Sequence, residues 1–86
     1  MLELMFIGAP WCPQCPQAKV NFERAMTKSQ GIKWEYVDVE TNPDIGHKFE
    51  IMSVPTVIAL RDGVEVARMG TGTVLQYRKM IEGATN

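Results

Sequence analysis

The sequence predicts an α/β domain in which three helices flank a four-stranded mixed sheet. Its 86 residues leave room for one hydrophobic core, so residues 1–86 are expected to form a single domain. With 45% hydrophobic and 22% charged residues, the composition is that of a folded chain rather than a disordered one. Segments with strand and helix patterns alternate, and then a hairpin and a last helix follow, which is an order typical of mixed sheets.

The first half of the chain contains two predicted strands and the longest predicted helix. Residues 2–7 form a nearly continuous apolar run, typical of a strand that is covered on both faces. Residues 13–30 are expected to be helical, and Gly31 stands where a left-handed residue ends many helices. Residues 33–39 are rich in aromatic and β-branched side chains and therefore predict a second strand. The helical segment has apolar residues at helical spacing, namely Cys15, Ala18, Phe22 and Met26.

A short helix and a hairpin are predicted next. Asn42 and Pro43 form a typical helix start, with the proline at the first helical position. Residues 56–60 and 64–69 predict two strands, and the Asp62-Gly63 pair between them is a strong hairpin signal. These strands are therefore expected to pair antiparallel.

The last predicted element is a C-terminal helix. Thr73 and Gln76 have the spacing of a capping box, in which each side chain bonds a free backbone amide of the other residue. Val74, Tyr77 and Ile81 follow at helical spacing and mark the buried face. Residues 83–86 are expected to fray.

The order of these elements predicts how they are arranged. A right-handed crossover makes the first two strands parallel neighbours, and the hairpin then pairs on the other side of the first strand. The helices would cover both faces of the sheet. Chemistry collects at the carboxyl ends of parallel strands in such sheets, and residues 11–15 follow the first strand at that end.

Charge and hydropathy exclude several classes of partner. Nine basic and ten acidic residues give a net charge of −1, so no nucleic acid or anionic membrane is expected to bind. No stretch approaches the roughly 18 apolar residues of a spanning helix. The apolar N-terminus carries Glu3 and lacks the basic region of a signal peptide, so a cytoplasmic protein is expected.

The two cysteines of the chain, Cys12 and Cys15, predict redox chemistry. A bridge across two residues closes too short a loop to stabilise the fold much. With Cys12 as helix N-cap and Pro13 as first helical residue, the amides of Gln14 and Cys15 would converge on the Cys12 sulfur. The helix dipole acts in the same direction, so Cys12 is predicted to be the nucleophile with a lowered pKa.

Cys15 is predicted to be the resolving thiol. It lies one turn further along the helix, on its core side, where it would be less accessible and could attack a mixed disulfide on Cys12. Metal binding or an inert disulfide is the alternative, but a zinc site needs four ligands and the chain offers only His47 and carboxylates besides the cysteines. No metal or bound cofactor is therefore expected, apart from a redox-active Cys12–Cys15 disulfide.

The segment WCPQCPQAK at residues 11–19, with SVPT at residues 53–56, resembles the thioredoxin and glutaredoxin superfamily. The resemblance implies a minimal thioredoxin fold and a thiol–disulfide oxidoreductase. It also implies that Pro55 follows a cis peptide bond, faces the cysteines and presents the Val54 backbone to a substrate chain. The substrate-binding residues are then expected to be Trp11, Pro13, Gln14, Val54, Pro55 and Gly70.

The chain departs from the family pattern at three places. Phe6 stands where thioredoxins have a buried aspartate, and Tyr36 stands at the position of its lysine partner. The glycine pair and aspartate with which glutaredoxins hold glutathione are missing at residues 70–73.

Lys19 either lowers the pKa of Cys12 or is a solvated side chain.

The resemblance also implies partners. They are a thioredoxin reductase as electron source and disulfide substrates such as ribonucleotide reductase, for a chain expected to be monomeric. A glutathione-linked glutaredoxin is the alternative function, and a metal-binding or redox-sensing module is a third. The six methionines, among them Met52, are expected to fill the core.

Overall fold

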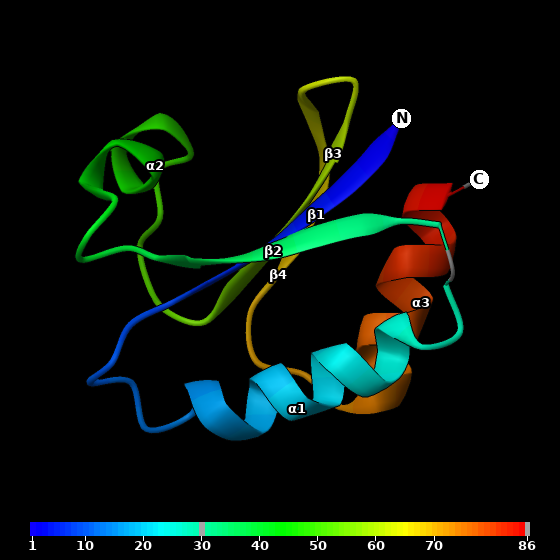
Figure 1. The fold of residues 1–86 in the computed structure, drawn as a ribbon, viewed down its shortest axis with the longest axis horizontal. Coiled ribbons are helices and arrows are strands. Elements are labelled where there is room, and N and C mark those ends of the chain that lie inside the picture. The colour runs from blue at the N-terminus through cyan, green and yellow to red at the C-terminus, as the bar shows by residue number, and fades with distance from the viewer. Residues whose placement is uncertain (30, 86) are drawn as a thin grey trace.

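The computed structural model describes residues 1–29 and 31–85 and contains the seven predicted elements (Figure 1). Their bounds along the chain are β1 (Leu2–Gly8), α1 (Cys15–Met26), β2 (Lys33–Asp38), α2 (Pro43–Lys48), β3 (Thr56–Arg61), β4 (Val64–Met69) and α3 (Val74–Thr85).

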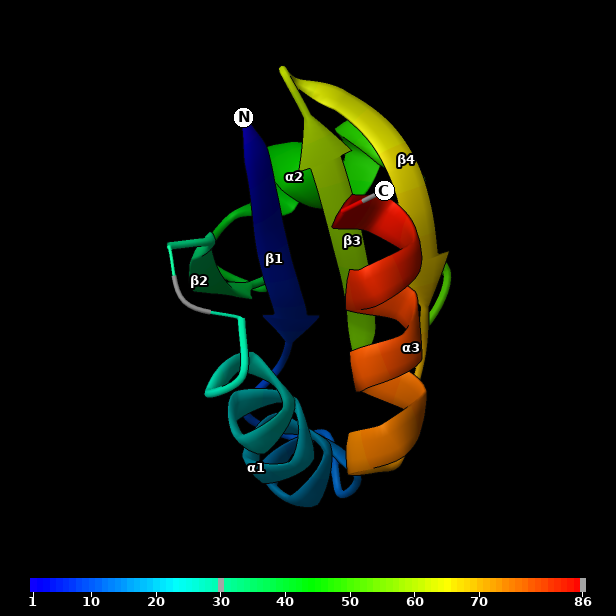
Figure 2. The same cartoon turned by 90° about the vertical axis from the view of Figure 1, so that its right-hand side faces the viewer.

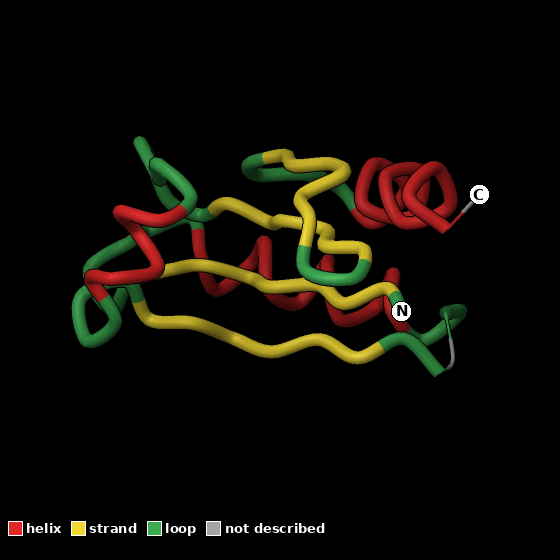
Figure 3. Tube along the Cα trace, turned by 90° about the horizontal axis from the view of Figure 1, so that it is seen from above, coloured by secondary structure: helices red, strands yellow, loops and turns green. Residues whose placement is uncertain are grey.

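The four strands form one mixed sheet in the order β2-β1-β3-β4, as predicted. Strand β1 is parallel to β2 and antiparallel to β3, and β4 extends the sheet as the second strand of the hairpin. Helices α1 and α3 cover one face, and α2 lies behind the other (Figure 2). The loop after β1 and helix α2 lie at one end of the sheet, and the N-terminus and the last turn of α3 lie at the opposite end (Figure 3).

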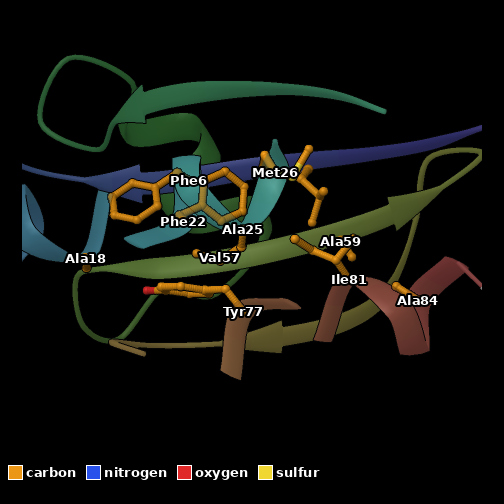
Figure 4. Packing of buried hydrophobic residues seen from close by; sticks show 11 residues of the cluster. Phe6, Ala18, Phe22, Ala25, Met26, Val57, Ala59, Tyr77, Ile81 and Ala84 are labelled. Atoms are coloured by element: carbon orange, nitrogen blue, oxygen red, sulfur yellow. The ribbon is translucent and has the colours of Figure 1, made fainter. Parts of the chain in front are cut away.

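The main core lies between the sheet and helices α1 and α3. Phe6 of β1, Phe22 of α1 and Tyr77 of α3 are fully buried there. The Phe22 ring centroid lies 5.7 Å from that of Phe6 and 5.6 Å from that of Tyr77 (Figure 4). A smaller core on the other face packs Ile45 and Phe49 of the α2 region against the sheet. The sheet is therefore covered on both faces, as the apolar run of β1 predicts.

Helix α1 is shorter than the predicted segment 13–30. It begins at Cys15 because the chain first makes a turn, in which the Cys12 amide donates to the Ala9 carbonyl at 3.2 Å. It ends at Met26, whose carbonyl accepts from the Ser29 amide at 2.9 Å, a tight turn that replaces further helix. The predicted helical residue Gln30 lies outside the described residues.

The turns and caps of the second half follow their predicted chemistry in most places. Asp62 and Gly63 both have positive φ, 52° and 85°, as the hairpin turn requires. The Gln76 amide donates to Thr73 Oγ1 at 3.1 Å, and the Thr73 amide donates to Gln76 Oε1 at 2.9 Å, so the capping box is confirmed. The expected fraying from Gly83 is wrong as far as Thr85, where α3 ends.

Candidate active site

A disulfide between Cys12 and Cys15 lies where β1 leads into α1, with the two Cα atoms 5.4 Å apart. Both cysteines are 5% exposed and pack with Ala9 against Val39 and Val54. The sequence places them there because β1 ends at Gly8 and α1 begins at Cys15 itself. The pair therefore lies at the carboxyl end of a parallel strand, as predicted.

The Cys15 backbone amide donates to Cys12 Sγ at 3.1 Å. This amide is one of the free N–H groups in the first turn of α1, where the helix dipole is positive. Both effects stabilise negative charge on the Cys12 sulfur when the disulfide is open. The prediction that Cys12 is the N-cap and Pro13 the first helical residue is wrong, because α1 begins at Cys15 and its N-cap is Gln14. The second predicted donor, the Gln14 amide, makes no bond to Cys12 Sγ in the described part of the chain.

The predicted difference in accessibility between the two cysteines is absent from this disulfide form. Each is equally buried, because the Cys12 side chain folds back over the first turn of α1 and packs against Ala9 and Val54. What distinguishes them here is polarity: Cys12 Sγ accepts a backbone hydrogen bond within the turn.

The segment before β3 packs against the disulfide. The Val54–Pro55 peptide bond is cis, as the resemblance implied, and Val54 packs against the cysteine cluster. Thr56 Oγ1 donates to the Ser53 carbonyl at 2.6 Å, which ties this turn to the start of β3. A Cβ atom on Gly70 would lie 3.5 Å from the Pro55 carbonyl oxygen, so Gly70 is in contact with the same turn. The structure therefore brings Val54, Pro55 and Gly70 together beside the cysteines.

The remaining predicted residues lie on the solvent side of the cysteine turn. Trp11 is 64% exposed, and Pro13 and Gln14 are also exposed. Sequence reasoning missed Thr71, whose hydroxyl donates to Gln14 Oε1 at 2.9 Å and so links the cysteine turn to the loop after β4. Its position next to Gly70 was the only available signal. Met52, expected in the core, is 92% exposed because it precedes the Pro55 turn rather than a strand.

A shallow pocket of about 210 Å³ lies beside the disulfide. Its lining includes both cysteines, Lys19 and Tyr36. Lys19 forms an ion pair with Glu23 at 3.4 Å, and its Nζ lies 6.0 Å from the centre of the Tyr36 ring. Partial burial, and secondly the charge of Asp38, raise the pKa of Tyr36 above 10.0. Larger hollows elsewhere on the described residues contact neither cysteine.

Two observations bear on the alternatives of metal binding and membrane insertion. The described residues contain no group of three or more histidine, cysteine, aspartate or glutamate side chains that could hold a metal ion, and His47 is exposed on α2. Among those residues, no helix has both the length and the apolar character needed to cross a membrane.

Comparison with known proteins agrees with this geometry. The chain is 36% identical over 67 residues to thioredoxin from Mycobacterium tuberculosis, covering 77% of this chain and 58% of that protein. It is 26% identical over 81 residues to glutaredoxin-3 from Bos taurus, covering 94% of this chain and 24% of that protein. The chain thus spans 58% or less of the length of these relatives.

Solved structures support the fold. The thioredoxin of Fasciola hepatica superposes with a TM-score of 0.87 at 24% identity, covering 96% of this chain and 80% of that one. A structure described as a malarial protein also gives 0.87, at 20% identity, and covers 100% and 99% of the two chains. The sequence model of the thioredoxin domain matches residues 3–81. The chain therefore belongs to the thioredoxin domain family and has its fold.

Proposed function

We propose that this chain is a thiol–disulfide oxidoreductase that reduces protein disulfides, with Cys12 as nucleophile and Cys15 as resolving thiol. The observation that carries the proposal is the hydrogen bond from the Cys15 amide to Cys12 Sγ at the start of α1. A donor fixed at this point lowers the pKa of the Cys12 thiol, because it stabilises the thiolate and not the thiol.

The reaction has two exchange steps. The Cys12 thiolate attacks one sulfur of the substrate disulfide, forms a mixed disulfide and releases the other substrate sulfur as a thiolate, which takes up a proton. Cys15 then loses its proton and attacks Cys12 Sγ, which releases the second substrate thiolate. The substrate disulfide has gained two electrons, and Cys12 and Cys15 are left oxidised as the disulfide seen here.

Exposed groups around the disulfide supply a surface for a substrate chain. Trp11 offers a large exposed ring, and an extended segment could pair with the backbone at Val54, which packs against the cysteines. Gln14, held by Thr71, lies between the two cysteines in sequence and is exposed toward the same partner. We propose Trp11, Pro13, Gln14, Val54, Pro55 and Gly70 as the substrate-binding residues.

The proposed electron source is a thioredoxin reductase, and the proposed substrates are disulfide proteins such as ribonucleotide reductase. Trp11, Pro55-Thr56 and Gly70 support this choice, because these are the positions at which the chain resembles thioredoxins. A monomeric protein in a reducing, cytoplasmic environment suits this role. Gel filtration and cell fractionation test these two points.

The second candidate is a glutaredoxin that takes electrons from glutathione. The Cys-Pro-x-Cys sequence with Ala18-Lys19 and the match to glutaredoxin-3 over 94% of this chain favour it. The missing glycine pair and aspartate at residues 70–73 argue against it. Electron source is therefore the property that separates the two functions.

Insulin reduction driven by NADPH tests both candidates in parallel mixtures. One mixture contains thioredoxin reductase, and the other contains glutathione with its reductase. We expect activity in the first mixture only, its loss in Cys12→Ser, and no change in His47→Gln, an exposed control on α2. Activity only with glutathione would select the second candidate, and activity in neither would contradict both.

Trapping tests the assignment of the two thiols. Cys15→Ser in its reduced form should accumulate a mixed disulfide through Cys12 with a target that contains a disulfide, and Cys12→Ser should not. Trapping through Cys15 instead would reverse the roles.

A metal assay on the purified protein tests the third alternative, since a metal-binding module would purify with its ion.

A further inference from the structure

The Tyr36 hydroxyl and the Cys15 sulfur lie together at the end of β1. A Cβ atom placed on Gly8 would be 3.1 Å from Tyr36 Oη and 3.2 Å from Cys15 Sγ. Tyr36 Oη and Cys15 Sγ therefore both lie within 3.2 Å of this Cβ position, and the distance between them is at most the sum of the two distances. The missing side chain of Gly8 leaves this space open, and the same two residues line the shallow pocket beside the disulfide.

The sheet directs the Tyr36 ring to this place. Tyr36 is the register partner of Phe6 across the parallel pair β1 and β2, and the two rings stack with centroids 6.1 Å apart. Phe6 is fully buried, so the stack fixes one face of the Tyr36 ring against the core. The hydroxyl end then projects along the sheet toward Gly8 and Cys15, where it contacts the open pocket.

The Tyr36 hydroxyl is protonated at neutral pH, and its surroundings raise its pKa further. Partial burial raises its pKa, and the carboxylate of Asp38 on the same strand acts in the same direction. From α1, Lys19 faces the ring and is paired with Glu23. A phenol that holds its proton at neutral pH can donate a hydrogen bond to an anion beside it.

We propose that the Tyr36 hydroxyl donates a hydrogen bond to the Cys15 thiolate and thereby accelerates the resolving step. The inference rests on the proposed function and extends it to a residue outside the cysteine motif. Tyr36 keeps its proton throughout. Cys15 gives its own proton to solvent through the pocket, and its thiolate then attacks Cys12 Sγ and releases the substrate thiolate.

The proposed hydrogen bond would also act when the disulfide is reduced. An external thiolate attacks Cys12 Sγ, the Cys12–Cys15 bond breaks, and Cys15 leaves as a thiolate that takes a proton from solvent. Leaving groups depart faster when their thiolate is stabilised. A hydrogen bond to an ionised group contributes more free energy than one between neutral groups. For the Cys15 thiolate we expect this stabilisation to change the rate roughly tenfold.

Reaction of the reduced protein with dithiobis(nitrobenzoate) separates the two thiols. Cys12 attacks the reagent and releases one coloured thionitrobenzoate, and Cys15 then resolves the mixed disulfide and releases the second. Cys15→Ser should show the first phase alone, which assigns the phases. Tyr36→Phe keeps the stacked ring and removes only the hydroxyl, and Glu35→Gln is the matched control on the same strand.

In Tyr36→Phe the second phase should slow roughly tenfold at neutral pH, and its pH profile should move to higher pH. The first phase should stay within twofold, and Glu35→Gln should match the wild type. Unchanged second-phase kinetics and pH profile, or equal slowing of both phases, would overturn the proposal. So would slowing in Lys19→Met alone, which would make Lys19 the donor.

Failure of this inference is distinguishable from failure of the proposed function. If the wild type releases both thionitrobenzoates and reduces insulin while Tyr36→Phe matches it, only the role of Tyr36 is wrong. If the wild type forms no mixed disulfide, the proposed function itself is contradicted. Circular dichroism establishes that Tyr36→Phe is folded, as its 40% exposed ring leads us to expect.

Discussion

Replacing Phe6 by aspartate would put a carboxyl group into the aromatic core below the active site. The Phe6 side chain is fully buried and contacts the rings of Phe22 and Tyr36. Removing a buried phenylalanine costs about 3–5 kcal/mol, and a buried polar group without a partner costs about 1–3 kcal/mol more. At about 0.05–0.15 kcal/mol per residue, a chain of this length has a free energy of unfolding of only about 4–13 kcal/mol.

Phe6→Asp should therefore lose most or all of its stability in urea denaturation followed by circular dichroism. Phe6→Leu is the control, because it keeps an apolar side chain and should lose only about 1–2 kcal/mol. Burial raises the pKa of the new carboxyl, so the unfolded chain ionises first and the deficit should grow as the pH rises above about 4. A variant within about 1 kcal/mol of the wild type would refute this view of the core.

Two further predictions concern α3. Thr73→Ala removes the side-chain acceptor for the Gln76 amide and should lower the free energy of unfolding by about 1 kcal/mol, whereas Thr85→Ala at the other end should change it less. Equal losses would contradict the capping role. Burial raises the pKa of Tyr77, so the folded state keeps its proton after the unfolded chain ionises, and stability should fall as the pH rises above about 10. In Tyr77→Phe, which also loses the 2.8 Å bond to the Gly70 carbonyl, this alkaline fall should be smaller; an equally steep fall would exclude Tyr77 as its cause.

The order and topology of the elements could be predicted because local signals and the fold agree. The apolar run of β1, the Asp62-Gly63 turn and the Thr73 capping box each act over a few residues, and each is present in the structure. The bounds of α1 could not be predicted in the same way. Cys12 lies in a turn closed by its bond to Ala9, and no residue pattern distinguishes that turn from a first helical turn.

Contacts between distant loops were also beyond prediction from the sequence. The cysteine motif and the Pro55 turn are visible as short sequences, and their meeting follows from the fold. The bond between Thr71 and Gln14 joins residues 57 positions apart, and a single sequence contains no signal for such a pair. Met52 shows the reverse problem, because its apolar side chain suggests burial while its place in the turn exposes it.

Phe6 and Tyr36, at which the chain departs from the family pattern, are register partners across β1 and β2. A carboxylate at position 6 would need a cation or donors beside it, and the stacked Tyr36 ring provides an apolar surface instead. Lys19 lies 6.0 Å from the centre of that ring and is paired with Glu23. The Tyr36 ring therefore favours an aromatic side chain over a carboxylate at position 6. Since position 6 carries no carboxylate that could take the proton of Cys15, the route that we propose for that proton is the pocket that Tyr36 and Lys19 line.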